Sequence, residues 1–397
     1  MDKDSSVDIV IFGGGIAGLW LLAKLRRLNY SAVLLESGSL GGVQTIASQG
    51  IIHGGTKYAL GGKLSDASVE IGGMPQIWRD CLNGEGELDL REVKVLSSHQ
   101  NLWCTRNLSS RLAGFFAGKA MRSRMEAIDR NRLPQLFDHP SFGGDLYRLD
   151  EPVLDIPSLV DVLVKQQGRF CFSTDNTTLA LDQDKPGRII INSAAGTIRL
   201  QARRLIFTAG EGTTELLSKL GIDRPTAQLR PLHMVMVTGA LPELYAHCLE
   251  GSANPRITIT SHTLADGRQA WYLGGQLAER GVERDRQEQI KAAKSELRAT
   301  LPWIDLDGTR WSTFRINRAE PKSRSGERPK SCSVHTTPAA IAAWPIKLAF
   351  APRLAAKIIT TLNGEKLLPG DADIAALQAL PQPPIAQPPW ELEKQWS

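Results

Sequence analysis

The hydrophobic positions near the start of the chain follow the pattern of a strand, a helix and a second strand. Residues 8–12 are a short, mostly β-branched apolar run without alternation, which is typical of a strand buried on both faces. Residues 16–29 are rich in Leu and Ala and predict a helix, and residues 32–35 predict another buried strand. Because such a unit builds a parallel sheet, we expect an α/β domain at the N-terminus.

Further elements are predicted along the chain, with strands dominating the second half. Helices are predicted at residues 63–82, 106–132, 283–300 and 348–362. Strands are predicted at residues 169–173, 177–182, 187–192, 197–200, 203–210, 232–239, 256–261 and 269–276. Basic residues surround an apolar face in 106–132, which is typical of a solvated amphipathic helix. The Pro- and Ala-rich tail from about residue 368 predicts an extended arm without a clear core face.

The distribution of these elements predicts more than one domain. A chain of 397 residues exceeds one ordinary domain, and strand–glycine patterns occur both near the start and at 203–210. We therefore predict a Rossmann-like cofactor domain that is discontinuous in sequence, with a mixed, largely antiparallel β substrate domain inserted. The predicted division is 1–82, 150–225 and 331–365 for the cofactor domain, 83–149 and 226–330 for the substrate or cap domain, and 366–397 for the tail.

Composition narrows the candidate partners only slightly. A net charge of +5 and a pI near 8.9 favour anionic small molecules mildly, and they neither require nor exclude a nucleic acid. The five cysteines are scattered and contain no C-x-x-C, so we predict no disulfide framework and no metal site, and we expect the cytoplasm. No signal-peptide pattern precedes the first strand, and no apolar run is long enough to span a membrane, although peripheral membrane contact stays open.

Gly13, Gly15 and Gly18 directly follow the first predicted strand and fill the pattern G-x-G-x-x-G. The first glycine allows a tight turn, the second lets a pyrophosphate approach the backbone, and the third lets the helix pack on the strand. The helix N-terminus offers free N–H groups and a partial positive charge to the phosphates. Glu36 ends the second strand, where a carboxylate can bind both ribose hydroxyls and disfavours NADP. The segment predicts a dinucleotide site.

The segment after Glu36 separates FAD from NAD. Residues 44–58 form a long polar, glycine-rich loop close behind the second strand. A nicotinamide dehydrogenase has no need of such a loop, whereas an extended FAD passes beside one along its pyrophosphate and isoalloxazine. We therefore predict FAD as the cofactor.

These motifs give the chain a family resemblance. It resembles the D-amino-acid-oxidase-like superfamily of FAD enzymes, and the segment Gly50 to Gly55 is similar to the I-H-G-G or I-H-A-G segment of glycerol-3-phosphate dehydrogenase and L-2-hydroxyglutarate dehydrogenase. Residues 57–64 resemble the continuation in the hydroxyglutarate enzyme. Residues 208–210 and 346–348 are similar to two further family segments, the second of which is a glycine-lysine turn that faces the flavin pyrimidine. The resemblance implies an α/β flavoprotein fold of the glutathione-reductase type.

The motif and the resemblance together predict the residues of the site. Those expected to bind FAD are Gly13, Gly15, Ile16, Ala17, Gly18, Glu36, Ser37, Gln44, Thr45, Ser48, Gln49, Gly50, Gly210 and Lys347. The resemblance places His53 near the flavin ring, where it could orient substrate, stabilise the flavin or attach to it covalently. Lys347 could stabilise negative charge on reduced flavin. Arg318 is similar in position to an arginine that binds the substrate anion, and a guanidinium can bind a carboxylate or phosphate bidentately.

The function expected from these residues is FAD-dependent oxidation of a C–H next to a hydroxyl or an amine in a small anionic substrate. Hydride would pass to flavin N5, and a base would take the O–H or N–H proton. A 2-hydroxy acid or a polyol phosphate is the leading substrate class, and an amine or amino-acid oxidase is the alternative on the same fold. The basic segments 106–132 and 315–330 leave open a flavoprotein that acts on a macromolecule such as RNA. The electron acceptor stays open among a quinone, an electron-transfer protein and oxygen.

Overall fold

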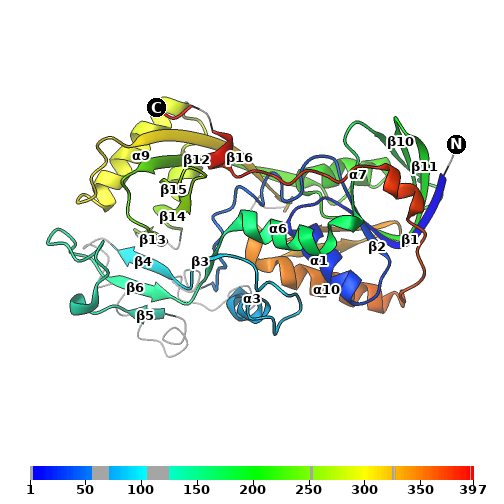
Figure 1. Ribbon diagram of the computed structural model, residues 1–397, viewed down its shortest axis with the longest axis horizontal. Helices are drawn as coiled ribbons and strands as arrows, with labels where there is room; N and C mark the ends of the chain where they lie inside the picture. Colours follow the sequence, from blue (N-terminus) through cyan, green and yellow to red (C-terminus); the bar gives the residue numbers. More distant parts are fainter. Residues whose placement is uncertain are drawn as a thin grey trace.

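The chain folds into two domains, each built on a large sheet (Figure 1). The computed structural model describes residues 3–55, 71–104, 125–250, 254–323, 326, 328–393 and 395–397. We name the domain that contains the N-terminal strand the cofactor domain, and the domain that contains the longest strands the cap domain.

The cofactor domain holds the predicted parallel sheet. Its strand order is β17-β18-β11-β1-β2-β8, and the pairs β18–β11, β11–β1, β1–β2 and β2–β8 are parallel. Strands β9 and β10 extend β11 on an antiparallel path. The bounds are β1 (Lys3–Phe12), β2 (Ala32–Glu36), β8 (Cys171–Ser173), β9 (Thr178–Leu181), β10 (Arg188–Ser193), β11 (Gly196–Phe207), β17 (Ser333–Thr336) and β18 (Ala340–Trp344). The strands predicted at 197–200 and 203–210 are thus one strand, which ends before the turn at 208–210.

Helices cover this sheet through apolar faces. Helix α1 packs against both α6 and α10, and its Leu- and Ala-rich sequence is buried along most of its length because it lies between them and the sheet. Such a helix needs apolar residues on more than one face. The helix bounds are α1 (Ile16–Arg27), α3 (Met74–Leu82), α6 (Ile156–Gln167), α7 (Thr213–Lys219) and α10 (Ala351–Gly364). Asp155 caps α6, whose helical pattern the sequence analysis missed.

The cap domain is a mixed, largely antiparallel sheet, as predicted. Its strand order is β16-β12-β15-β14-β13-β4-β6-β5, and only β13 and β4 pair in parallel within this order. The strand bounds are β4 (Gln100–Cys104), β5 (Met125–Ala127), β6 (Leu146–Leu149), β12 (Ala227–Gly239), β13 (Ala246–Leu249), β14 (Ile257–Thr263), β15 (Gln269–Gly274) and β16 (Arg310–Pro321). Helices α8 (Gln276–Arg280) and α9 (Arg286–Thr300) pack on β12, and β3 (Val95–Ser97) pairs with β7 (Val153–Leu154) apart from both large sheets.

The C-terminal tail differs from the prediction because it has buried apolar contacts. Leu377 is fully buried in the core of the cofactor domain. Ile385 makes a bridge with Leu40 farther along, and Trp390, in the short helix α11 (Pro389–Leu392), stacks on buried His262 of the cap domain at 3.9 Å between ring centroids. The tail, red in Figure 1, therefore crosses from one domain to the other.

Other predictions fail where long-range pairing or packing decides the structure. Residues 125–132 form β5 and a short 3-10 helix instead of the end of an α-helix, since β5 pairs with β6; residues 105–124 of that prediction lie outside the described residues. Leu88 and Leu90, assigned to the cap domain, are buried in the core of the cofactor domain. Of the predicted helix 63–82, the described part is α3. None of the described helices is long and apolar enough to cross a membrane.

Candidate active site

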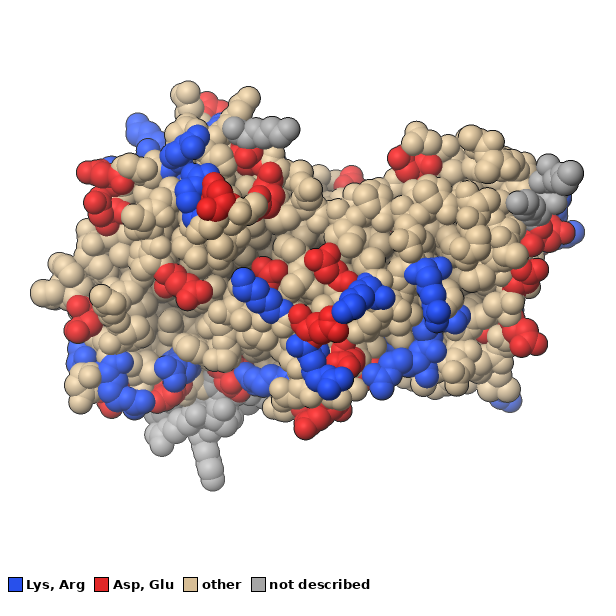
Figure 2. Space-filling model, viewed as in Figure 1, with Lys and Arg blue, Asp and Glu red and all other residues tan. Residues whose placement is uncertain are grey.

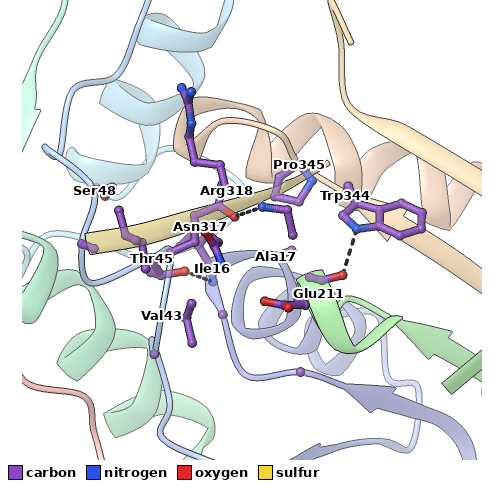
Figure 3. Close-up of a pocket in the computed structure, with 18 of the residues that line it drawn as sticks. Ile16, Ala17, Val43, Thr45, Ser48, Glu211, Asn317, Arg318, Trp344 and Pro345 are labelled. Carbon is purple, nitrogen blue, oxygen red and sulfur yellow. Dashed lines mark hydrogen bonds between the residues drawn. The ribbon is translucent and has the colours of Figure 1, made fainter. Parts of the chain in front are cut away.

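A cavity of about 850 Å³ lies where the two domains meet. Its wall is built by the end of β1, the start of α1, the loop that follows β2, the turn after β11, strands β12, β14 and β16, and the segment after β18. Figure 3 shows residues of α1, the loop and β16 converging on it. The volume lies in the range of ligand sites in proteins, and most predicted site residues border it.

Two glycines of the G-x-G-x-x-G motif are required by close backbone contacts. Gly13 has a φ of +104°, and a Cβ there would lie 2.6 Å from Ala209 Cα in the turn after β11. A Cβ on Gly18 would lie 2.0 Å from the Gly13 carbonyl oxygen. Gly18 does not border the cavity. Its role is therefore to let α1 pack against β1, as the third glycine of the motif requires.

The N-terminus of α1 borders the cavity with Gly15, Ile16 and Ala17. Gly15 is the N-cap and supplies no side-chain cap, and the first amide of the helix, at Ile16, donates to Thr45 Oγ1 at 2.9 Å. A Cβ on Gly15 would meet only that Thr45 hydroxyl, at 3.2 Å. Ser48 also borders the cavity, and its buried hydroxyl has no hydrogen-bond partner among the described residues. A helix N-terminus with open backbone beside it is an anion site.

Three predicted cofactor residues border the cavity but make other contacts. Gln44 Oε1 accepts from the Ala319 amide, and Gln49 Nε2 donates to the Tyr272 carbonyl at 2.9 Å. A Cβ on Gly50 would lie 2.1 Å from the Leu154 carbonyl oxygen. These residues connect the loop to the cap domain and to the segment that contains Leu154. Their expected cofactor contacts stay a prediction.

His53 borders the cavity and is held from behind by a buried carboxylate. Its Nδ1 lies 3.2 Å from Glu151 Oε2, and the Glu151 side chain is only 3% exposed. The ring of His247, on β13, stacks on that of His53 at 5.7 Å between centroids. The ligand atoms of His53, Glu151 and His247 lie within 4.8 Å of one another, so together they could hold a metal ion. The sequence analysis predicted no metal site and missed both partners of His53.

Arg318 lies on β16, and Figure 3 shows its side chain extending away from the strand. Burial first, and nearby Arg328 second, lower the pKa of Arg318, although a guanidinium stays charged. Glu279 lies 3.4 Å from it and offsets part of the charge. Arg328 also borders the cavity and pairs with fully buried Glu320 at 3.0 Å, as does Arg230 at 2.8 Å. The three arginines and two glutamates leave an excess of one positive charge.

Lys347 borders the cavity directly after a strained segment. Ile346 has a φ of +56°, and Val43, across the site on the loop, has a φ of +50°. Positive φ is unfavourable for β-branched residues, and such strain gathers at functional sites. Ile346 stands where the family resemblance expects glycine, so this chain keeps a glycine-like backbone with a bulky side chain. The Lys347 ammonium lies 5.6 Å from the Phe350 ring centroid.

The profile of the FAD dependent oxidoreductase (DAO) family matches residues 8–330. The chain belongs to this family. It is 45% identical over 397 residues to the probable FAD-dependent oxidoreductase PA4991 of Pseudomonas aeruginosa, covering 99% of each chain. The crystal structure of that protein superposes with a TM-score of 0.83 at 40% identity, covering 98% of this chain and 99% of that chain.

Solved structures with much lower sequence identity show the same fold. Glycine oxidase from Geobacillus kaustophilus superposes with a TM-score of 0.65 at 14% identity, covering 94% of this chain and 98% of its own. L-alpha-glycerophosphate oxidase from Mycoplasma pneumoniae, solved with FAD bound, gives 0.64 at 14% identity, covering 90% and 95%. Both structures share the mixed-sheet α/β architecture predicted from the sequence. The finer resemblance to glycerol-3-phosphate and L-2-hydroxyglutarate dehydrogenases is not confirmed by these comparisons.

The residues at this site of the DAO-family enzyme fit FAD. The glycine-bounded N-terminus of α1 and the unpartnered Ser48 hydroxyl suit its pyrophosphate. The Glu36 carboxylate borders the cavity at the end of β2 and accepts from the Gly14 amide at 2.5 Å and the Gly38 amide at 2.7 Å. These two bonds fix the carboxylate at the cavity wall, and Glu36 would be the residue that accepts from the adenosine ribose of bound FAD. Ser37, Ala17 and Gly210 border the same part of the wall.

Glu36→Ala is expected to weaken FAD binding by about 1–3 kcal/mol, the range for hydrogen bonds to a charged group, which is roughly a 5- to 150-fold rise in Kd. The substitution removes the ribose acceptor and the carboxylate that orders Gly14 and Gly38. The measurement is titration of apoprotein with FAD by flavin fluorescence. An unchanged Kd would mean that the carboxylate only stabilises the backbone at Gly14 and Gly38 and does not contact FAD. Glu87→Ala, which removes a carboxylate bound to Lys24 and Trp20 on the far end of α1, is the control.

Proposed function

We propose that this DAO-family enzyme oxidises the carbon that bears a hydroxyl group in a small anionic substrate, either a 2-hydroxy acid or a polyol phosphate. Bound FAD would supply the two-electron acceptor, taking hydride at N5. The observation that carries the proposal is the pair of His53 and buried Glu151 at the cavity wall. An alcohol needs a base for its O–H proton as the C–H bond breaks, whereas a neutral amine already presents a lone pair. A histidine backed by a carboxylate therefore favours the hydroxyl substrate.

The charges around the cavity support an anionic substrate. Arg318 and Arg328 both border it, and burial of Arg318 leaves a cation that Glu279 only partly offsets. A desolvated cation is costly unless an anion pairs with it. A carboxylate or phosphate on Arg318 would hold the adjacent hydroxyl-bearing carbon in the cavity. His53 Nε2 would then accept the hydroxyl proton, and Lys347 is proposed to offset negative charge at the reduced cofactor.

Two arginines of the basic segment 315–330 give less support to the macromolecule alternative than their charge suggests. Arg315 donates to the carbonyls of Val282 and Arg284, and Arg328 pairs with Glu320, so both serve the fold or the cavity. Basic and acidic side chains are mixed over most of the face in Figure 2. Residues 105–124 of the other basic segment lie outside the described residues.

Anaerobic mixing of the holoenzyme with a metabolite panel is expected to bleach the flavin with 2-hydroxy acids or polyol phosphates. Neutral alcohols of the same chain length should leave it oxidised, because they lack the anion for Arg318. The measurement is stopped-flow absorbance of the oxidised flavin band. Dithionite reduction of the same sample confirms that the flavin is reducible. Bleaching by amino acids alone would replace this proposal by the amine oxidase alternative.

The cellular setting and the electron acceptor are part of the proposal. All five cysteines are buried thiols outside any disulfide, which suits a reducing cytoplasm. A quinone, an electron-transfer protein or oxygen would reoxidise the flavin. The same stopped-flow experiment, continued with each acceptor in turn, identifies the one that returns the flavin band.

A further inference from the structure

The C-terminal tail pairs by backbone hydrogen bonds with two segments of the cofactor domain. The Leu40 amide donates to the Pro384 carbonyl at 2.8 Å, and the Ala386 amide donates to the Leu40 carbonyl at 2.9 Å. The amide of Ser173, the last residue of β8, donates to the Pro381 carbonyl at 2.8 Å. The tail therefore lies along both the end of β8 and the loop that follows β2.

Both segments adjoin Glu36, the residue that would accept from the adenosine ribose. Ser173 is paired with Glu36 in the parallel register of β2 and β8, and the Thr174 amide donates to the Glu36 carbonyl at 2.8 Å. Leu40 is buried in the loop that begins after Glu36. The tail thus supports the strand beside this carboxylate and the loop behind it.

The loop at Leu40 is in direct contact with the glycine motif. The Gly41 amide donates to the Gly14 carbonyl at 2.7 Å, and a Cβ on Gly14 would lie 2.6 Å from Leu40 Cδ2. The Ile46 amide donates to the Gly41 carbonyl at 2.9 Å, and the adjacent Thr45 hydroxyl accepts from the first amide of α1. A displacement of Leu40 would therefore disturb the turn at which the pyrophosphate is expected.

The far end of the tail is fixed to the cap domain instead. Trp390 is buried and stacks on His262 at 3.9 Å between ring centroids. The Trp311 amide, on β16, donates to the Ser397 carbonyl at 2.7 Å, and the Ser397 amide donates to the Trp311 carbonyl at 3.0 Å. Because an anchored chain keeps its neighbouring segment close to its binding site, these contacts favour the pairing at Leu40.

We propose that residues 381–386 position the adenosine end of the FAD site, and that the anchor at Trp390 keeps them there. Retention of FAD then depends on the contact between the tail and the cap domain. None of residues 381–390, all of which the structure describes, borders the cavity. The tail therefore acts on the cofactor through Leu40 and Ser173.

Ala386→Pro tests the pairing because proline has no N–H to donate to the Leu40 carbonyl. We expect FAD to leave the holoenzyme roughly 3- to 10-fold faster, the size expected for one lost hydrogen bond. The control is Gln387→Pro at the next position, whose amide makes no hydrogen bond among the described residues, and it should release FAD at the wild-type rate. The measurement is the rise of free-flavin fluorescence after rapid dilution of the holoenzyme.

Trp390→Ala tests the anchor from the other domain and leaves the pairing at Leu40 chemically intact. The control is Trp303→Ala, which removes another cap-domain tryptophan, one whose indole donates to the Leu136 carbonyl at 2.7 Å. We expect both variants to lower the unfolding midpoint, since each leaves a cavity. Only Trp390→Ala should also release FAD faster than the wild type.

Hydrogen exchange in the holoenzyme gives a second readout that needs no release of FAD. We expect faster exchange at the Leu40 and Gly41 amides in both test variants, with unchanged exchange in β1. Wild-type FAD release and wild-type exchange in a folded Ala386→Pro would overturn the positioning role. Equal acceleration in a test variant and its control would also overturn it, because the effect would then be a general loss of stability. Wild-type release in Trp390→Ala would overturn the dependence on the cap domain.

Discussion

Gly15→Val is expected to give a folded, colourless protein that retains no FAD. Gly15 has an extended backbone that valine adopts without strain, and a Cβ there meets only the Thr45 hydroxyl, at 3.2 Å. The rest of the side chain would enter the cavity at the N-terminus of α1. Because the pyrophosphate must approach the backbone at this point, its place would be taken. The measurements are flavin absorbance per protein and the thermal unfolding midpoint.

Gly18→Val is the matched control, with the same substitution three residues along the chain. Its Cβ would lie 2.0 Å from the Gly13 carbonyl oxygen and 2.9 Å from the Thr208 hydroxyl. The helix would have to move off the sheet, so we expect loss of both FAD and the folded state. Stoichiometric FAD in purified Gly15→Val would show that Gly15 is needed only for the turn between β1 and α1 and not for the approach of the pyrophosphate.

The contrast between these glycines shows what the sequence could predict. The spacing of Gly13, Gly15 and Gly18 between a β-branched run and a Leu-rich helix is local, and the dinucleotide site follows from it. In the structure Gly13, Gly15 and Glu36 border the cavity and Gly18 lies against the Gly13 carbonyl, while their contacts with a cofactor stay a prediction. The parallel sheet follows from the same local pattern.

The partners of His53 and Arg318 could not be predicted in this way. Glu151 and His247 are about 100 and 200 positions from His53, and backbone pairing of the segments around Ile51 and Val153, together with the cap sheet, brings them together. Arg328 borders the cavity and pairs with Glu320, and no sequence motif indicates either contact. None of these contacts has a periodic signature, since each depends on how separate segments pack in three dimensions.

The tail shows the same limit for packing. Its prolines predict an extended chain, but Leu377 and Trp390 lie in short helical turns and are buried in different domains. Composition reports the backbone tendency of a segment and not the surface that receives its side chains. The predicted domain division therefore set residues 366–397 apart as a separate tail, although these residues pack against both domains.

Arg318→Ala is expected to lower kcat/KM for the anionic substrate by about 2–4 kcal/mol, roughly 30- to 700-fold, the size expected for losing a buried charge-assisted pair. The guanidinium is mostly buried at the cavity wall. Its removal leaves Glu279 facing the cavity, which repels the same anion. The flavin content should stay normal, because Arg318 is not part of the α1 terminus that suits the pyrophosphate.

Arg315→Ala provides the control on the same strand. Its guanidinium donates to the Val282 and Arg284 carbonyls and does not border the cavity. We expect a modest loss of stability and no change in kcat/KM. The measurement is the rate of flavin reduction against concentration for one anionic substrate and its uncharged analogue. Two outcomes would contradict an anionic substrate. One is an equal kcat/KM of the wild-type enzyme for the anionic substrate and its uncharged analogue, and the other is an unchanged ratio of these two values in Arg318→Ala. The positive charge at the cavity would then only pair with Glu279 and Glu320.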